Sequence, residues 1–214
     1  MKAYLFDLDG TLVDSLGSIS YFANKSLKKF GMDTIPADRY KVLVGDGAAT
    51  LVKRMIKEVK GDESLFQSVY DEYNTTYDND FLYLAKPYDG IIDMLKNLKS
   101  SGHKIAIISN KPHSTTQKIC NELFGDLIDI CFGKREGYPV KPDPTSVYEV
   151  INKLSVKKSD CIYVGDTLTD MKTGSNAGIY TVGVLWGFRD ENELRCGNPQ
   201  KIVKTPAEIL AISE

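Results

Sequence analysis

The chain has 214 residues, more than one average domain and fewer than two, so we expect a core domain that carries an insert. Hydrophobic residues make up 42% of the chain and charged residues 26%, which excludes an intrinsically disordered protein. The 27 Lys and Arg residues against 29 Asp and Glu residues give a net charge of −2, so no basic excess draws the whole chain to nucleic acid or to an anionic membrane.

The amino-terminal residues do not resemble a secretion signal, because Asp7 and Asp9 interrupt the apolar stretch. No run of about 18 apolar residues predicts a transmembrane helix. The four cysteines form no CxxC pair, so we interpret them as reduced thiols, and two histidines make a zinc site improbable. We therefore expect a cytoplasmic protein that acts on a small molecule, with no nucleic acid or membrane as partner.

Short apolar runs recur along the chain and are separated by segments of helical length. Each run is rich in β-formers and apolar on both faces, which favours strands buried inside a parallel sheet. Between the first two runs, apolar residues at helical spacing from Ile91 to Leu98 predict a helix that Gly102 ends. The alternation predicts an α/β fold with a doubly wound, Rossmann-like, mostly parallel sheet, whose strands we place at residues 3–6, 103–109, 127–132, 161–165 and 179–184.

Residues 14–82 break this alternation. Three successive stretches have apolar side chains at helical spacing, beginning at Leu16, Leu51 and Phe66. They predict a helical domain inserted directly after the first strand, and Pro87 marks the return to the core. We therefore divide the chain into an α/β core of residues 1–13 and 83–214 and a helical insert of residues 14–82.

Two carboxylates, Asp7 and Asp9, follow the first predicted strand. In an open α/β sheet, ligands bind at the carboxyl ends of the strands. Two close carboxylates repel each other, so we expect a bound cation or a shared proton there. An Asp-Gly turn would explain Asp9 and Gly10 but gives no reason for Asp7.

A second pair, Asp166 and Asp170, follows the strand predicted at residues 161–165. A helix that begins near Thr167 would place Asp170 in its first turn, where a carboxylate complements the helix dipole. That role, and an N-cap role for Asp166, are the structural alternatives to a functional interpretation.

Ser109 and Asn110 end the second core strand, where a hydroxyl and backbone amides can hold a phosphate oxygen. A helix cap and turn is the alternative. Lys141 precedes a proline, which stiffens its loop, and Asp143 and Pro144 are expected to start the next helix. A solvated surface position is the alternative for Lys141.

These groups share one expected location, since all lie at or after the carboxyl ends of strands that converge on one crevice. Oxygen ligands without His or Cys favour Mg²⁺. A lysine, a hydroxyl and backbone amides favour a phosphoryl group, and a metal with such donors is what phosphoryl transfer requires.

The complete set resembles the motifs of the haloacid dehalogenase superfamily, in their usual order and over essentially the whole chain. Residues 7–11 resemble the first motif, Ser109 the second, Lys141 the third, and residues 165–170 the fourth. The resemblance implies that Asp7 is the nucleophile, which forms an aspartyl phosphate, and that Asp9 is the general acid and base.

The same resemblance implies the remaining roles. Mg²⁺ would be held by the carboxylates of Asp7 and Asp166 and by the backbone carbonyl of Asp9. Asp170 would support Lys141 or a metal-bound water, and Gly10 would allow a tight turn. The phosphoryl group would be bound by Thr11, Ser109, Asn110 and Lys141.

The insert resembles the helical cap of one branch of the superfamily, which closes over the substrate. Within that branch, residues 44–54, 109–112 and 186–188 resemble the phosphoglycolate phosphatases. This resemblance implies that Gly45, Gly47 and Arg54 contact the substrate, with a solvated helix face as the alternative for Arg54.

The resemblance implies a Mg²⁺-dependent phosphatase for a small phosphorylated metabolite, with 2-phosphoglycolate as the first expectation. Asp46 occupies a position that is more often neutral, and a charge facing the crevice would repel a substrate carboxylate. Pyrophosphate, a sugar phosphate or a nucleotide would then compete. A mutase of the β-phosphoglucomutase type and a non-enzymatic phospho-Asp signalling module are further alternatives. The protein is expected to be a monomer or a homodimer.

Overall fold

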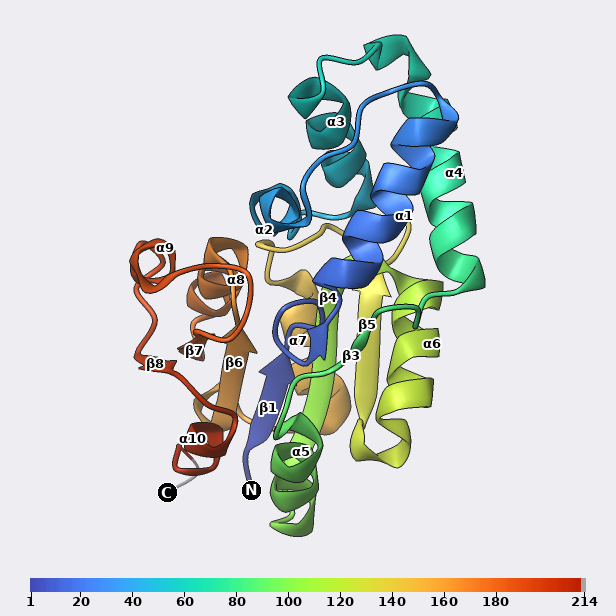
Figure 1. Ribbon diagram of the computed structural model, residues 1–214. Helices are drawn as coiled ribbons and strands as arrows, with labels where there is room; N and C mark the ends of the chain where they lie inside the picture. Colours follow the sequence, from blue (N-terminus) through green and yellow to red (C-terminus); the bar gives the residue numbers. More distant parts are fainter. Residues whose placement is uncertain (213–214) are drawn as a thin grey trace. The chain divides into compact units, whose positions relative to one another are not determined.

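The computed structural model describes residues 1–212 (Figure 1). The chain divides into two compact units, the first made of Met1–Asp14 and the chain from Pro87 onward, the second of Ser15–Lys86. The chain thus leaves the first unit after residue 14 and returns at residue 87, where the sequence predicted residues 13 and 83. A two-stranded sheet at these crossings pairs β2 (Val13–Asp14) with β3 (Lys86–Pro87).

Six strands of the described chain form one sheet in the first unit, in the order β5-β4-β1-β6-β7-β8. Every adjacent pair in this sheet is parallel, as the sequence predicted. Strand β1 lies between β4 and β6, so the strand order reverses direction there, and such a point binds ligands at its carboxyl side. The strands are β1 (Ala3–Phe6), β4 (Lys104–Pro112), β5 (Ile130–Lys134), β6 (Cys161–Gly165), β7 (Tyr180–Val184) and β8 (Lys201–Val203).

Helices cover both faces of this sheet, with α5 on one face and α7 on the other (Figure 1). Val147 and Val150 of α7 pack against Leu5 of β1 and Tyr163 of β6 in one buried cluster. Burial on both faces explains why the strands are apolar throughout. The helices are α5 (Ile91–Ser100), α6 (His113–Leu123), α7 (Thr145–Leu154), α8 (Leu168–Ala177), α9 (Glu191–Arg195) and α10 (Ala207–Leu210).

Strand β4 differs from its predicted bounds, because it continues beyond Ser109 as far as Pro112. The register of its pairing with β5 shifts between Ile108 and Pro112. The strand residues between these two positions therefore lie outside the regular ladder of hydrogen bonds. Residues 109–112 therefore lie at the end of the strand, and Pro112 pairs with Lys134 of β5. Helix α7 begins at Thr145, one residue later than predicted, and Asp143 Oδ1 accepts from the Thr145 amide at 2.9 Å.

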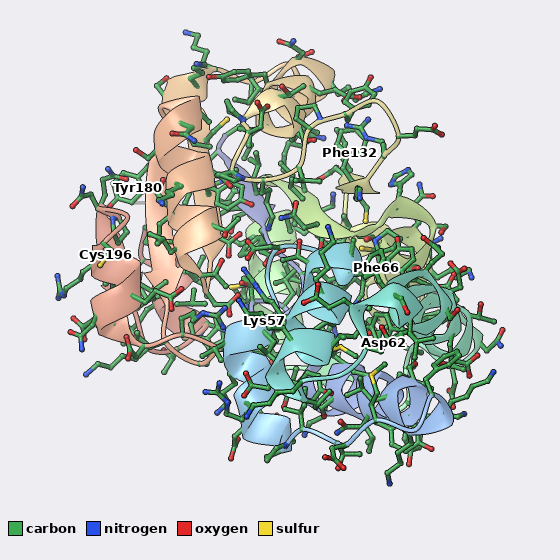
Figure 2. All side chains as sticks on the ribbon, turned by 90° about the horizontal axis from the view of Figure 1, so that it is seen from above. Lys57, Asp62, Phe66, Phe132, Tyr180 and Cys196 are labelled. Atoms are coloured by element: carbon green, nitrogen blue, oxygen red, sulfur yellow. The ribbon has the colours of Figure 1, made fainter. Side chains whose placement is uncertain are left out.

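The second unit is helical within its described residues. Helix α3 bears an apolar face that buries Leu51 and Met55, and α4 buries Val69 and Tyr73, as their spacing predicted. Figure 2 labels Lys57 near the end of α3 and Phe66 at the start of α4. The helices are α1 (Leu16–Lys29), α2 (Tyr40–Leu43), α3 (Ala48–Glu58) and α4 (Phe66–Asn79).

Short 3-10 turns complete the described chain at Ala37–Arg39, Glu63–Leu65, Gly125–Leu127 and Lys158–Asp160. None of the helices in residues 1–212 combines the length and apolar character needed to cross a membrane. All four cysteines are free thiols, and the Sγ atoms of Cys120 and Cys131 lie 2.7 Å apart between α6 and β5.

Candidate active site

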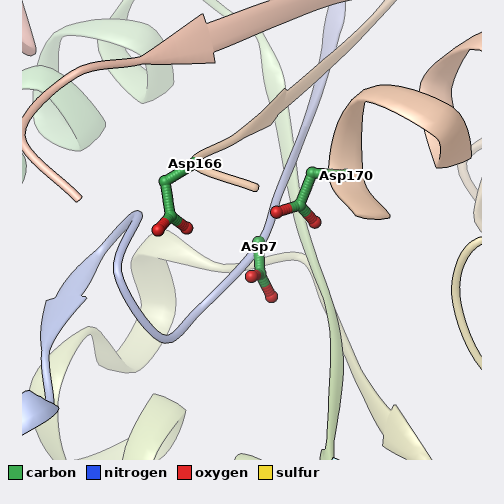
Figure 3. Close-up of side chains that lie close together, drawn as sticks. All are labelled: Asp7, Asp166 and Asp170. Atoms are coloured by element: carbon green, nitrogen blue, oxygen red, sulfur yellow. The ribbon is translucent and has the colours of Figure 1, made fainter. Parts of the chain in front are cut away.

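Three carboxylates from two segments of the first unit meet at the carboxyl end of the central strands. Asp7 follows β1, Asp166 follows β6, and Asp170 lies in the first turn of α8. One oxygen of each lies within 4.8 Å of the others, and the three side chains lie close together (Figure 3). Parallel pairing brings Asp7 and Asp166 together, since Phe6 pairs with Val164 and the Asp7 amide donates to the Val164 carbonyl at 2.9 Å.

Asp170 is held by the start of its own helix. Thr167 caps α8, its hydroxyl donates to Asp170 Oδ2 at 2.6 Å, and its amide donates to the same oxygen at 3.1 Å. The predicted helix start near Thr167 is therefore confirmed, with Thr167 as the N-cap instead of Asp166. The capping oxygen is Oδ2, which leaves Oδ1 directed at the rest of the site.

Lys141 supplies a positive charge to this cluster. Its Nζ lies 2.8 Å from Asp7 Oδ1 and 2.7 Å from Asp170 Oδ1, and its side chain is only 3% exposed. The surface interpretation of Lys141 was wrong, because the two carboxylates compensate the cost of burying the ammonium. Asp170 therefore supports Lys141, which was one of the two roles left open for it.

The backbone of Lys141 is fixed by Asn110 near the end of β4. The Lys141 amide donates to Asn110 Oδ1 at 2.9 Å, and Asn110 Nδ2 donates to the Lys141 carbonyl at 3.3 Å. The sequence placed Asn110 among the phosphate-binding residues. The side-chain amide of Asn110 positions Lys141, because both of its ends contact the backbone of that residue. Phosphate binding by Asn110 stays a prediction.

Thr11 contacts the carboxylate of Asp166. Its buried hydroxyl donates to Asp166 Oδ1 at 2.9 Å, and its predicted part in phosphate binding stays a prediction. The Phe188 amide donates to Asp166 Oδ2 at 2.8 Å, and Trp186 Nε1 donates to the Thr11 carbonyl at 2.9 Å. Both carboxylate oxygens of Asp166 are thereby oriented.

Gly10 makes room for Asp166. Its φ is +87°, a conformation that L side chains rarely adopt, and a Cβ there would overlap the Asp166 carboxylate. The tight turn that the sequence predicted at Gly10 therefore also clears space for a carboxylate from a distant segment.

Burial and mutual repulsion control ionisation in this cluster. Burial, followed by the charge of Asp170, raises the pKa of Asp7 well above its ordinary value. Burial and then Asp170 raise the pKa of Asp166 to about 7, against the hydrogen bonds from Phe188 and Thr11, which lower it. Burial alone would lower the pKa of Lys141, but the charges of Asp170 and Asp7 raise it well above its usual value. The cluster thus has more negative charge than Lys141 compensates.

Asp9 and Ser109 lie beside the same strand ends. The half-buried Asp9 forms an ion pair with Lys111, whose Nζ donates to Asp9 Oδ1 at 2.8 Å. Ser109 Oγ accepts from the Lys111 amide at 3.2 Å. Lys111 was not among the residues predicted from the sequence, although its place two residues after Ser109 indicates a position beside the site.

Gly45, Gly47 and Arg54 belong to the second unit, and their part in substrate binding stays a prediction. Both glycines have positive φ angles, 115° and 88°, so this loop requires them. Arg54 Nη2 lies 2.6 Å from Asp46 Oδ2, and Arg54 Nη1 donates to the Leu43 carbonyl at 2.9 Å. The charge of Asp46 is therefore paired within its own unit.

Comparison with known proteins identifies the class of this site. The model of the haloacid dehalogenase-like hydrolases matches residues 4–184. The chain belongs to this family, which confirms the resemblance seen in the motifs. The predicted class of enzyme, a phosphoric monoester hydrolase, is also confirmed by the relatives described next.

The relatives include phosphoglycolate phosphatases. That of Aquifex aeolicus is 32% identical, with 95% of this chain and 96% of the relative covered. That of Haemophilus influenzae is 27% identical, with 97% and 96% covered. A crystal structure of a predicted phosphoglycolate phosphatase from Haemophilus somnus has a TM-score of 0.92 at 26% identity and covers 100% of this chain and 98% of that one. The chain is similar to these phosphatases over its full length.

Proposed function

We propose that this protein is a Mg²⁺-dependent phosphatase that hydrolyses a small phosphomonoester through a phosphorylated Asp7. The observation that carries the proposal is the buried set of Asp7, Asp166 and Asp170 around a single ammonium group from Lys141. Such a set can bind a cation and a phosphoryl group side by side. The family and its phosphatase members support this chemistry.

The donor set fits Mg²⁺. It consists of carboxylate oxygens, and three buried carboxylates exceed the one lysine charge among them, so a cation would relieve their repulsion. The carboxylates of Asp7 and Asp166 and the backbone carbonyl of Asp9 would hold the ion. When bound, Mg²⁺ would neutralise charge on the phosphoryl oxygens, so that the anionic Asp7 carboxylate can approach the phosphorus atom.

The side chains account for the two chemical steps. A carboxylate oxygen of Asp7 attacks phosphorus while the ester bond breaks, and Asp9 gives a proton to the departing oxygen. Asp9 then takes a proton from water as the water oxygen attacks phosphorus, so that phosphate leaves and Asp7 is restored. Lys141 and Ser109 bind the phosphoryl oxygens, and Asp170 and Asn110 hold Lys141 in position.

For the substrate, we propose 2-phosphoglycolate first, because relatives named phosphoglycolate phosphatase match nearly the whole chain. The pairing of Asp46 with Arg54 weakens the reason for preferring a substrate without a carboxylate. We also propose that the enzyme acts in the cytoplasm on this class of metabolite, as a monomer or a homodimer.

The test is phosphate release from a panel of 2-phosphoglycolate, pyrophosphate, hexose phosphates and nucleoside monophosphates, with Mg²⁺ and with EDTA. We expect release only with Mg²⁺ and fastest from 2-phosphoglycolate. Asp7→Asn should lower kcat by at least about a thousandfold and keep the circular dichroism spectrum. The exposed Asp126→Asn serves as a control that removes the same charge elsewhere in the core unit.

Each other outcome identifies a different function. Full activity of Asp7→Asn would show that Asp7 is not the nucleophile. Phosphate release that continues in EDTA would show that the reaction does not require a metal. An isomerised sugar phosphate without free phosphate would favour the mutase. A stable phosphoprotein without turnover would favour the signalling module.

A further inference from the structure

The ion pair between Lys111 and Asp9 has no part in the chemistry described above. Lys111 Nζ lies 2.8 Å from Asp9 Oδ1, and the lysine side chain is 7% exposed. Lysine side chains are rarely buried without a task, because the ammonium loses its hydration. The site therefore holds a second buried ammonium group, beside the acid and separate from Lys141.

The backbone of Lys111 is fixed at both ends of the residue. Its amide donates to Ser109 Oγ at 3.2 Å, and its carbonyl accepts from Thr116 Oγ1 at 3.3 Å. A side chain at Gly133 would overlap this carbonyl, so β5 packs closely against it. Because the backbone cannot move freely, the ammonium is presented toward Asp9 from a rigid strand end.

We propose that Lys111 determines substrate specificity by binding a second anionic group, carried by the leaving alcohol of the phosphomonoester. This inference rests on the proposed function, in which Asp9 protonates the leaving oxygen. It assigns the substrate class as phosphomonoesters with a carboxylate or similar anion a few bonds from the ester oxygen.

Distances support this assignment. An acid donates its proton across about 2.6–3.2 Å, so the leaving oxygen lies within that distance of an Asp9 oxygen. When Asp9 Oδ1 is the donating oxygen, the ammonium, 2.8 Å from that atom, lies within about 6 Å of the leaving oxygen. In 2-phosphoglycolate, two carbons, one of them the carboxylate carbon, join the ester oxygen to a carboxylate oxygen roughly 3 Å away, which leaves about 3 Å for a hydrogen bond to the ammonium.

A purely structural pair is the alternative, in which Lys111 only holds Asp9 in place. The two roles separate experimentally. A structural role affects every substrate alike, because every substrate needs Asp9. A binding role affects substrates according to the charge of their leaving group.

The test compares 2-phosphoglycolate with 2-hydroxyethyl phosphate, which replaces the carboxylate by an uncharged hydroxymethyl group. Lys111→Met removes the ammonium and keeps most of the side-chain volume, and Lys111→Arg keeps the charge. Lys104→Met is the matched control, since Lys104 lies at the other end of β4, in a half-buried ion pair with Asp129 at 3.5 Å.

Lys111→Met should lower the ratio of kcat/KM for 2-phosphoglycolate over 2-hydroxyethyl phosphate by about ten- to a hundredfold, the range expected for a charge-assisted hydrogen bond. The loss for the anionic substrate should include a raised KM. Lys111→Arg should retain most of the preference, and Lys104→Met should leave the ratio unchanged. Thermal unfolding of each variant checks that it remains folded.

An equal loss for both substrates in Lys111→Met would overturn the inference and assign Lys111 to positioning Asp9. A wild-type enzyme that hydrolyses both substrates equally well would also overturn it, while leaving the proposed phosphatase intact. The absence of phosphate release from any compound of the wider panel would instead refute the proposed function, and this inference with it.

Discussion

Replacing Asp166 with Asn should change how the stability of the metal-free protein depends on pH. Asp166 is fully buried, and burial together with the charge of Asp170 raises its pKa to about 7, from an ordinary value of 3.8. The folded protein therefore holds a proton at Asp166 more tightly than the unfolded chain does. The stability that this proton contributes is fully present below pH 4 and is lost as the pH rises through 7.

The size of the effect follows from the shift of about three units. At about 1.4 kcal/mol per unit, wild-type protein in EDTA should lose up to about 4 kcal/mol of unfolding free energy between pH 4 and pH 8 through this group. Asp166→Asn removes the titrating group, and it also removes one of the charges that raises the pKa of Asp7. The unfolding free energy of the variant should therefore depend less on pH, and at pH 8 it should be higher than that of the wild type.

Asparagine can keep a hydrogen bond to each of the two groups that donate to Asp166, the Phe188 amide and the Thr11 hydroxyl. Its carbonyl oxygen can accept from the Phe188 amide in place of Asp166 Oδ2. Its amide can donate to the Thr11 hydroxyl, which now donates to Asp166 Oδ1 and can accept after rotation. The difference between the two proteins is thus mainly one of charge.

Urea unfolding in EDTA at intervals from pH 4 to pH 8 measures this difference, with Asp126→Asn as the surface control. Parallel profiles for the wild type and Asp166→Asn would refute the reasoning, because they would show that burial does not raise the pKa of Asp166. In a second series with Mg²⁺ at pH 8, the wild type should be stabilised more than Asp166→Asn, since the variant lacks one metal ligand.

Two further predictions concern the residues that shape the site. Gly10→Ala should destabilise the protein by about 3 kcal/mol in urea unfolding, because φ is +87° and the new Cβ overlaps the Asp166 carboxylate. The control Gly31→Ala, at φ +70° with open space around it, should cost about 1 kcal/mol. Equal losses in the two variants would show that only backbone strain matters. Asn110→Ala should destabilise by about 2 kcal/mol and lower kcat, since the buried Lys141 amide loses its acceptor; a variant with unchanged kcat would show that Lys141 holds its position without Asn110.

The sequence predicted the central strands well because burial on both faces makes them apolar throughout. Strands β1 and β6 have the bounds that their apolar runs indicated. Strand β8 and helix α2 were not predicted, since three or four residues are too few to show a periodic pattern. The extension of β4 to Pro112 depends on its pairing with β5, which is a contact between distant segments.

At the site, the sequence predicted which backbone positions converge, but not which side chains bond to one another. The convergence of Asp7, Ser109 and Asp166 follows from strands that end at one edge of a parallel sheet. The partners of Thr11 and Asn110 depend on rotamers and on segments more than 30 residues away, at Asp166 and at Lys141. Local patterns contain no information on such contacts.

The ion pair between Asp46 and Arg54 reconciles two expectations that seemed opposed. The sequence indicated Arg54 as a substrate contact and Asp46 as a charge that would repel a substrate carboxylate. The two side chains are 35% and 38% exposed and lie 2.6 Å apart, and exposed pairs of this kind contribute only about 0–1 kcal/mol. An anionic substrate could therefore displace Asp46 from Arg54 at small cost. Before the substrate binds, the positive charge of Arg54 compensates the negative charge of Asp46. Asp46 therefore need not repel a substrate that carries a carboxylate. Discrimination among phosphomonoesters then depends more on the buried ammonium of Lys111 than on the charge of this loop.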